Sequence, residues 1–147
     1  MTNIINIFKN KSKYSNAIFH KTRKIFQKYG YTISTSYDDR AVLNLVIGGD
    51  GTFLSAVHQS EFSEIPFIGI NTGHLGFYQE IEVDLIEDFV KRFTKNDYLI
   101  EELTVLESKV NNRSFKAINE VVVKSNKNQI VRPVSYTHLR AHETLRY

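Results

Sequence analysis

The stretch that decides the fold is VIGGDGTFLSAVH, residues 46–58. The chain has only 7 glycines, and three of them lie within four positions around a single carboxylate, Asp50. The apolar, β-branched run 42–47 is typical of a strand buried on both faces, and residues 52–60 carry apolar side chains at helical spacing. This order places a glycine-rich turn at the carboxyl end of a parallel strand, where open α/β sheets bind ligands.

Strands and helices alternate along the first part of the chain. The sequence predicts a short strand at 4–8, an amphipathic helix that ends at Gly30, a buried strand at 65–70 and a second amphipathic helix at 83–93. Short connections between such elements favour right-handed βαβ units. We therefore expect an α/β domain with a largely parallel, Rossmann-like sheet over residues 1–97.

The pattern changes from residue 98. Strand-like runs separated by polar turns predict antiparallel hairpins, which would be the first strands of an incomplete, β-rich second domain over residues 98–133. Residues 134–144, VSYTHLRAHET, look like a reading-frame translation of a sequencing-library adapter. We therefore expect residues 134–147 to be an artefact rather than biological sequence.

Composition excludes several classes of protein. With 19 Lys and Arg against 16 Asp and Glu, the formal net charge of +3 is too small to indicate binding to nucleic acid or to an anionic membrane. The absence of cysteine excludes a disulfide scaffold and a thiolate zinc site. No secretion signal begins the chain, and no apolar run reaches the roughly 20 residues of a membrane span. These features predict a cytoplasmic protein.

The glycine-rich turn has the chemistry of a phosphate site. Glycine permits positive φ and lets backbone N–H groups approach an anion, and the following helix N-terminus favours negative charge. A carboxylate such as Asp50 repels phosphate unless it holds a divalent cation or accepts a proton from an attacking hydroxyl. Phosphoryl transfer uses both a divalent cation and a proton acceptor. The alternative is that Asp50 only caps its own helix and the glycines only form a tight turn.

Two better-known glycine loops do not fit this stretch. A P-loop requires a lysine after its spacer, whereas Thr52 and Phe53 follow Gly51. The dinucleotide-binding fingerprint, aligned on Gly49 and Gly51, requires a small residue where the chain has Leu54.

A second glycine-bearing element, GINTGHLGFYQE at 69–80, follows the next strand. Six of the 7 glycines lie in residues 48–76, so two loops are expected to face one another across a cleft. Phe77 and Tyr78 could offer flat surfaces to a nucleobase or belong to the core. His74 could touch a phosphate or a hydroxyl, or be structural.

A third element is the pair Asn119 and Glu120, which follows a strand-like run. An amide can pair with the adenine edge, and a carboxylate can hold ribose hydroxyls. Such pairs also form ordinary turns.

The three motifs GGDGTFLSAVHQ, FIGINTGHLGFY and INEVVVKS, in this order, resemble the bacterial NAD kinase family, in particular its Gram-positive type. The resemblance runs from the first strand to about Pro133. The GGDGT motif alone is shared with phosphofructokinases and with diacylglycerol and sphingosine kinases. A lipid or sugar kinase and a non-catalytic nucleotide-binding module therefore remain alternatives.

The resemblance implies transfer of the γ-phosphoryl group of ATP, or of polyphosphate, to the 2′-hydroxyl of the adenosine ribose of NAD, forming NADP. Asp50 would accept the proton of that hydroxyl. A divalent cation, Mg²⁺, would assist, with no protein side chain assigned to it. Small nucleotides would be the partners, and the complete protein would be a homodimer or homotetramer. The implied NAD and ATP contacts are Gly48, Gly49, Asp50, Gly51, Thr52, Phe77, Tyr78, Asn119 and Glu120, with His74 as a further candidate.

Family members continue into a domain with a second Gly-Asp-Gly element and a Ser/Thr-rich run, which this sequence lacks. The resemblance therefore predicts that the 147-residue chain is inactive or nearly so. A coupled assay of NADP formation with the purified chain measures this directly, and robust turnover would contradict it.

Overall fold

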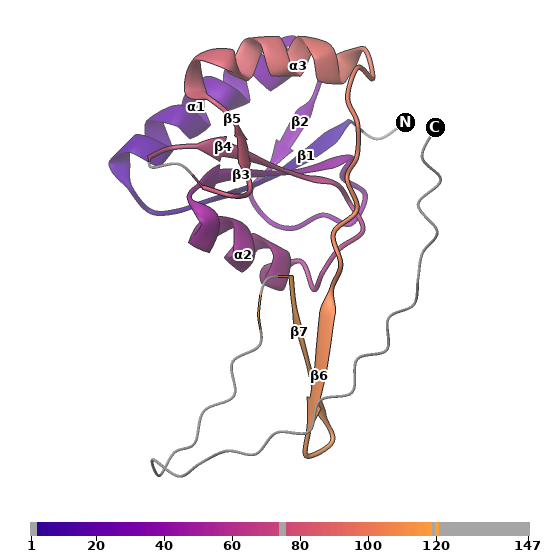
Figure 1. The fold of residues 1–147 in the computed structure, drawn as a ribbon. Helices are drawn as coiled ribbons and strands as arrows, with labels where there is room; N and C mark the ends of the chain where they lie inside the picture. The colour runs from indigo at the N-terminus through magenta and orange to yellow at the C-terminus, as the bar shows by residue number, and fades with distance from the viewer. Residues whose placement is uncertain (1–2, 74–75, 119, 121–147) are drawn as a thin grey trace. The chain divides into compact units, whose positions relative to one another are not determined.

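The computed structural model describes residues 3–73, 76–118 and 120, and the chain divides after Glu102 into two units. In the first unit, five strands form one parallel sheet in the order β2-β1-β3-β4-β5 (Figure 1). The strands are β1 (Ile4–Lys9), β2 (Thr32–Ser34), β3 (Leu43–Gly48), β4 (Phe67–Asn71) and β5 (Gln79–Ile81). The helices are α1 (Lys13–Lys28), α2 (Asp50–Gln59) and α3 (Ile86–Thr94), with a short 3₁₀ turn, η1 (Val83–Leu85), before α3. The predicted α/β fold with a parallel sheet is confirmed.

Strand β3 is the centre of this unit, and all six of its residues are buried. Helices α1 and α3 cover one face of the sheet and α2 covers the other (Figure 1). Leu43, Leu45 and Ile47 belong to the core cluster on the α1 and α3 side, whereas Val46 alternates toward α2. The sequence prediction of a strand buried on both faces is therefore confirmed.

Local signals fix both ends of α1. The Ser12 hydroxyl accepts a hydrogen bond from the Ser15 N–H at 3.0 Å, which satisfies one of the free donors of the first turn. At the other end Gly30 adopts a φ of +83°, in the left-handed region that favours glycine. The predicted helix end at Gly30 is confirmed.

The strand order places a topological switch point between β1 and β3. From β1 the chain moves outward to β2 on one side, and then returns to β3 on the other. In open α/β sheets the crevice outside the carboxyl ends of two such strands binds ligands. Here those ends are Lys9 and Gly48.

Three details differ from the sequence predictions. Helix α2 begins at Asp50 rather than at residue 52, and the predicted helix at 83–93 begins as the turn η1. Strand β5 was not predicted, because three residues are too few for an alternating pattern to show.

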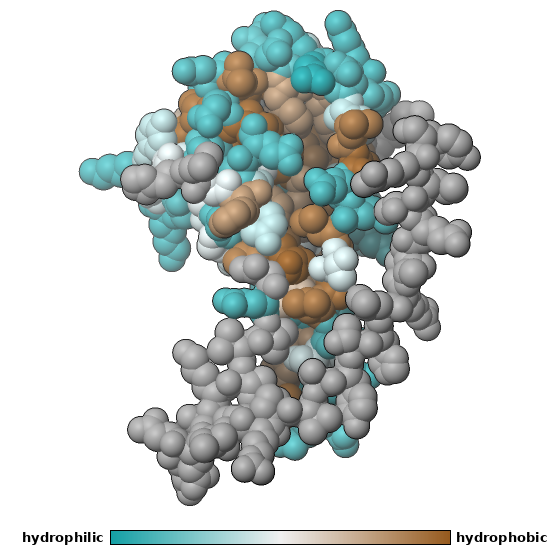
Figure 2. Space-filling view, viewed as in Figure 1, coloured by the Kyte–Doolittle hydropathy of each residue, from teal (hydrophilic) through white to brown (hydrophobic). Residues whose placement is uncertain are grey.

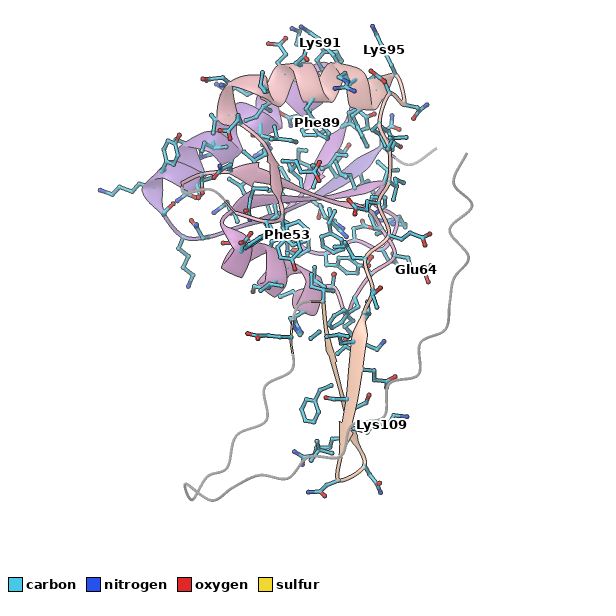
Figure 3. The ribbon with its side chains drawn as sticks, in the orientation of Figure 1. Phe53, Glu64, Phe89, Lys91, Lys95 and Lys109 are labelled. Carbon is cyan, nitrogen blue, oxygen red and sulfur yellow. The ribbon has the colours of Figure 1, made fainter. Side chains whose placement is uncertain are left out.

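The side chains of α3 divide cleanly between core and solvent. Figure 3 shows Phe89 on the inner side of α3 and Lys91 and Lys95 directed away from the sheet. The outer surface at the top of Figure 2, where α3 lies, is accordingly mostly hydrophilic. Among the described residues, no helix is long and apolar enough to cross a membrane.

The second unit contains an antiparallel hairpin, β6 (Leu106–Val110) and β7 (Arg113–Ala117). Asn111 and Asn112 form its turn, with φ values of +47° and +62° that asparagine tolerates well. The hairpin predicted around this turn is confirmed. The strand-like run predicted at 120–125 lies almost entirely outside the described residues.

Backbone strain after α2 leads to a stability prediction. Glu61 has a φ of +53°, which is costly for a residue with a Cβ. Relief of this strain exceeds the entropy cost of glycine, so Glu61→Gly should raise the free energy of unfolding by about 0.5–1 kcal/mol in urea titrations. Glu64→Gly, an exposed control with ordinary φ, should lower it instead; equal destabilisation by both would contradict the prediction.

Candidate functional site

The candidate site lies at the carboxyl ends of the central strands, where the two glycine-bearing loops meet. Gly49 is the N-cap of α2, and its carbonyl accepts from the N–H groups of Thr52 and Phe53 at 2.9 and 3.1 Å. Asp50 is the first helical residue, and α2 has no side-chain cap. The alternative that the Asp50 side chain only caps its own helix is therefore wrong.

The Asp50 carboxylate instead bridges the two loops. Oδ1 and Oδ2 both accept from the Phe77 N–H, at 3.0 and 3.1 Å, and Oδ1 also accepts from the Tyr78 N–H at 3.2 Å. The first of these bonds joins residues 27 positions apart, so the loops that were expected to face one another are in direct contact. A carboxylate offers about four acceptor positions, so Asp50 keeps capacity for a further donor such as a hydroxyl.

Gly76 makes this approach possible. A Cβ at position 76 would lie 2.7 Å from Asp50 Oδ1 and would collide with the Gln79 side-chain oxygen. A Cβ at Gly48 would likewise lie 2.6 Å from the Cβ of Thr52. Close packing therefore requires glycine at position 48, whereas at position 76 a Cβ would displace the ends of the Asp50 and Gln79 side chains.

Positive φ is not the reason for the glycines of the two loops. All 7 glycines are described, and Gly30 is the one with positive φ, so that expectation is wrong for the loops. Gly49 and Gly51 instead have no neighbouring atom within 4 Å of where a Cβ would lie. Their missing side chains leave open space against the backbone, which is the property that an approaching anion needs.

A groove of about 760 Å³ runs along α2 beside the first glycine loop. Gly51, Ser55 and Gln59, spaced every fourth residue, place one face of α2 along it. Its other lining residues are Ile7, Phe8, Lys9, Asn10, Lys11, Thr35, Ser36, Tyr37 and Thr52. The groove thus begins at the switch point between β1 and β3 and has the segment 35–37 as its second wall.

The groove combines cations with a helix N-terminus. Lys9 lines the groove, but its Nζ is directed at α1, where it donates to Asn16 Oδ1 at 2.7 Å and lies 5.6 Å from the centre of the Phe19 ring. Lys11 adds a second positive charge, and the first turn of α2 supplies free N–H groups. This end of the groove favours a phosphate-like anion.

Asp38, the first of the two carboxylates that follow the segment 35–37, is already engaged. Asp38 binds the Arg40 guanidinium through Nε at 2.9 Å and Nη2 at 2.7 Å. These hydrogen bonds lower the pKa of Asp38 to about 2. The carboxylate therefore stays ionised and paired, and it does not offset the charge of the two lysines.

The two adjacent aromatic residues have different surroundings. The Tyr78 ring stacks on Phe53, with centres 4.9 Å apart and planes 11° from parallel, whereas Phe77 is 94% exposed. Tyr78 is thus partly a packing residue, and Phe77 presents a free ring. Figure 3 shows Phe53 between α2 and the sheet.

The remaining candidates are only partly placed. Thr52 lines the groove, and Glu120 is exposed in the second unit. His74 and Asn119 lie outside the described residues. Within the described residues, no three His, Cys, Asp or Glu side chains group as a metal site.

Sequence reasoning missed three residues of the site. Phe53 was assigned only to a helix face, and nothing indicated that it lies under Tyr78. Gly76 was counted among the glycines, but its contact with Asp50 depends on the tertiary structure. Gln79 has a buried side-chain amide without a hydrogen-bond partner in the described part of the chain, and no pattern marks it.

Comparison with known proteins gives a consistent match. The family model described as the ATP-NAD kinase N-terminal domain matches residues 4–98. An NAD kinase of Finegoldia magna is 46% identical over 134 residues, which cover 87% of this chain and 49% of that protein. An NAD kinase of Lysinibacillus sphaericus is 36% identical, over 76% of this chain and 44% of that protein. The chain thus spans about half the length of these curated relatives.

A solved structure agrees in fold. Yeast NADH kinase, crystallised as a complex with NADH, superposes with a TM-score of 0.65 at 15% identity, over 78% of this chain and 46% of the yeast chain.

The contact between Gly76 and Asp50 can be tested. Gly76→Ala should displace the Asp50 carboxylate and the Gln79 side chain from their present positions and lower the free energy of unfolding by about 1–3 kcal/mol. Gly73→Ala is the matched control, because open space surrounds a Cβ there. Thermal unfolding and amide NMR shifts of Phe77 and Tyr78 measure both effects. Equal stability and unchanged shifts in the two variants would show that the close approach is not required.

Proposed function

Because the chain belongs to the ATP-NAD kinase family, we propose that it is the nucleotide-binding part of an NAD kinase. The proposed reaction transfers the γ-phosphoryl group of ATP to the 2′-hydroxyl of the adenosine ribose of NAD and forms NADP. The observation that supports this most directly is the position of Asp50, whose carboxylate is held between two glycine loops and next to an anion-favouring groove.

In the proposed reaction Asp50 accepts the proton of the attacking hydroxyl. Two backbone N–H groups orient the carboxylate, and an acceptor position remains for the substrate. Free carboxylates are weak bases for an alcohol, so orientation of the two reactants supplies most of the rate acceleration. The N–H groups at the start of α2 and the two lysines of the groove stabilise the negative charge on the transferring group.

The donor phosphates are proposed to bind in the groove beside Gly51 and Lys11. The described residues contain no group of three acidic side chains that could hold a metal ion, and Mg²⁺ does not require one, because it usually keeps several waters and binds largely through the substrate phosphates. When bound, Mg²⁺ would neutralise phosphate charge. Gly49 and Gly51 leave room for the phosphates to approach the backbone.

The acceptor nucleotide is proposed to bind on the other side of Asp50. Phe77, with its exposed ring, is suited to stack on adenine, and Tyr78 supports it from its stack on Phe53. Asn119 and Glu120 would complete the NAD contacts. We further propose a cytoplasmic enzyme, because its substrates would be dissolved nucleotides, and a homodimer or homotetramer for the complete protein.

The function is tested in an extended protein that joins residues 1–133 to the carboxyl-terminal half of the Finegoldia relative. NADP formation from ATP and NAD should occur, whereas diacylglycerol and fructose 6-phosphate should not be phosphorylated. Preference for either of those acceptors would favour the lipid or sugar kinase alternative. Nucleotide binding without turnover of any acceptor would favour the non-catalytic module.

Two substitutions separate the roles of Asp50 in the same extended protein. Asp50→Asn keeps an oxygen acceptor for the Phe77 and Tyr78 N–H groups but cannot accept a proton, so kcat should fall at least about 100-fold, with a smaller loss of melting temperature than in Asp50→Ala. Asp50→Ala should lower kcat and also remove the hydrogen bonds between the two loops. Full activity of Asp50→Asn would place the proton acceptor elsewhere.

Gly51→Ala should separate stability from binding in the 147-residue chain. Alanine favours the helix by up to about 1 kcal/mol, so the melting temperature should rise. Its methyl group would occupy the open space, so affinity for MgATP by calorimetry should fall on the order of tenfold, or ~1.4 kcal/mol. His58→Ala, on an exposed position of α2 outside the groove, should leave affinity unchanged. If Gly51→Ala binds MgATP as tightly as the unmodified chain or more tightly, the phosphates do not bind beside Gly51.

A further inference from the structure

Two asparagines lie fully buried side by side in the centre of the sheet. Asn6 in β1 is 1% exposed and Asn44 in β3 is 0% exposed, and the two are paired in register. Asn6 Nδ2 donates to Asn44 Oδ1 at 2.9 Å. Buried amides are costly unless their hydrogen bonds are made, so their partners indicate what they hold in place.

Asn6 holds the backbone of Asp38 at both of its polar groups. The Asp38 N–H donates to Asn6 Oδ1 at 3.0 Å, and Asn6 Nδ2 donates to the Asp38 carbonyl at 2.9 Å. Asn6 is also paired with Ser34, the last residue of β2. The residues on both sides of the segment 35–37 are therefore fixed to one position of β1, and this segment is a wall of the groove.

Asn44 holds a second segment in the same way. Its Nδ2 donates to the Ile65 carbonyl at 3.3 Å, and its N–H donates to the Pro66 carbonyl at 2.8 Å. At the surface the Tyr37 hydroxyl donates to Ser63 Oγ at 3.0 Å. The segments before β3 and before β4 are thus joined twice, once through the buried amides and once through this outer hydrogen bond.

We propose that Asn6 is a positioning residue that holds the 35–37 wall of the groove in a binding-ready arrangement, with Asn44 and the Tyr37 to Ser63 hydrogen bond as its supports. The ligand concerned is a nucleoside triphosphate with its Mg²⁺, so the effect on affinity rests on the proposed function. The positioning of the 35–37 wall by Asn6 does not depend on the proposed function.

Amide hydrogen exchange and MgATP calorimetry on the 147-residue chain test this proposal together. Asn6→Ala should speed exchange of the Asp38 amide at least about tenfold, the equivalent of one lost hydrogen bond, and leave the β3 amides protected. It should also weaken MgATP binding several-fold. Val90→Ala is the matched control, because Val90 is buried in α3 on the opposite face of the sheet. This substitution should destabilise the fold without affecting the 35–37 wall. Val90→Ala should change the Asp38 exchange rate and the MgATP affinity by no more than about twofold from the unmodified chain.

Ser63→Ala covers the case in which Asn6→Ala does not fold. It removes the outer hydrogen bond, and with it the bond from the Ile65 N–H to Ser63 Oγ, without altering a residue that lines the groove. It should speed exchange in residues 35–38 by a smaller factor.

The outcomes separate this inference from the proposed function. Unchanged Asp38 exchange in Asn6→Ala, or a loss of MgATP affinity no greater than in Val90→Ala, would overturn the inference. If Asn6→Ala does not fold, unchanged exchange in Ser63→Ala overturns it. If the unmodified chain binds no MgATP, the groove assignment in the proposed function fails, and the exchange rates alone decide the role of Asn6.

Discussion

The hydrogen bonds from the Phe77 and Tyr78 N–H groups to the Asp50 carboxylate are the constraint on which the site depends. They join the start of α2 to the loop before β5 and fix the direction of the carboxylate. A charged acceptor strengthens such bonds to about twice the strength of neutral ones. Gly76 lies beside these bonds, and a Cβ at this position would be 2.7 Å from Asp50 Oδ1 and would displace the carboxylate.

Much of the fold could be predicted because its strongest elements carry long, regular patterns. The buried run of β3 and the apolar face of α1 were found from hydrophobicity alone, and Gly30 marked a helix end through its backbone preference. Strand β5 was missed because it is short and owes its place to pairing with β4. Pairing between distant strands has no local signature.

The site was predicted in part for a similar reason. Asp50 and its glycines stood out because a carboxylate among glycines has a limited set of chemical uses. Its bonds to backbone N–H groups could not be predicted, since every residue except proline has one. The groove was also not foreseen, because it depends on how the segment 35–37 returns over β1. Nothing in the sequence near Asn6 indicates that its amide is a partner of Asp38.

The paired asparagines also bear on how the sheet forms. Side chains alternate between the two faces of a strand, so a slip of one position between β1 and β3 would move Asn44 out of line with Asn6. Each buried amide would then lose its hydrogen-bond partner in apolar surroundings, which would cost several kcal/mol of folding free energy. The pair therefore penalises misaligned assembly of the two central strands, and it would favour correct alignment while the chain is still collapsing.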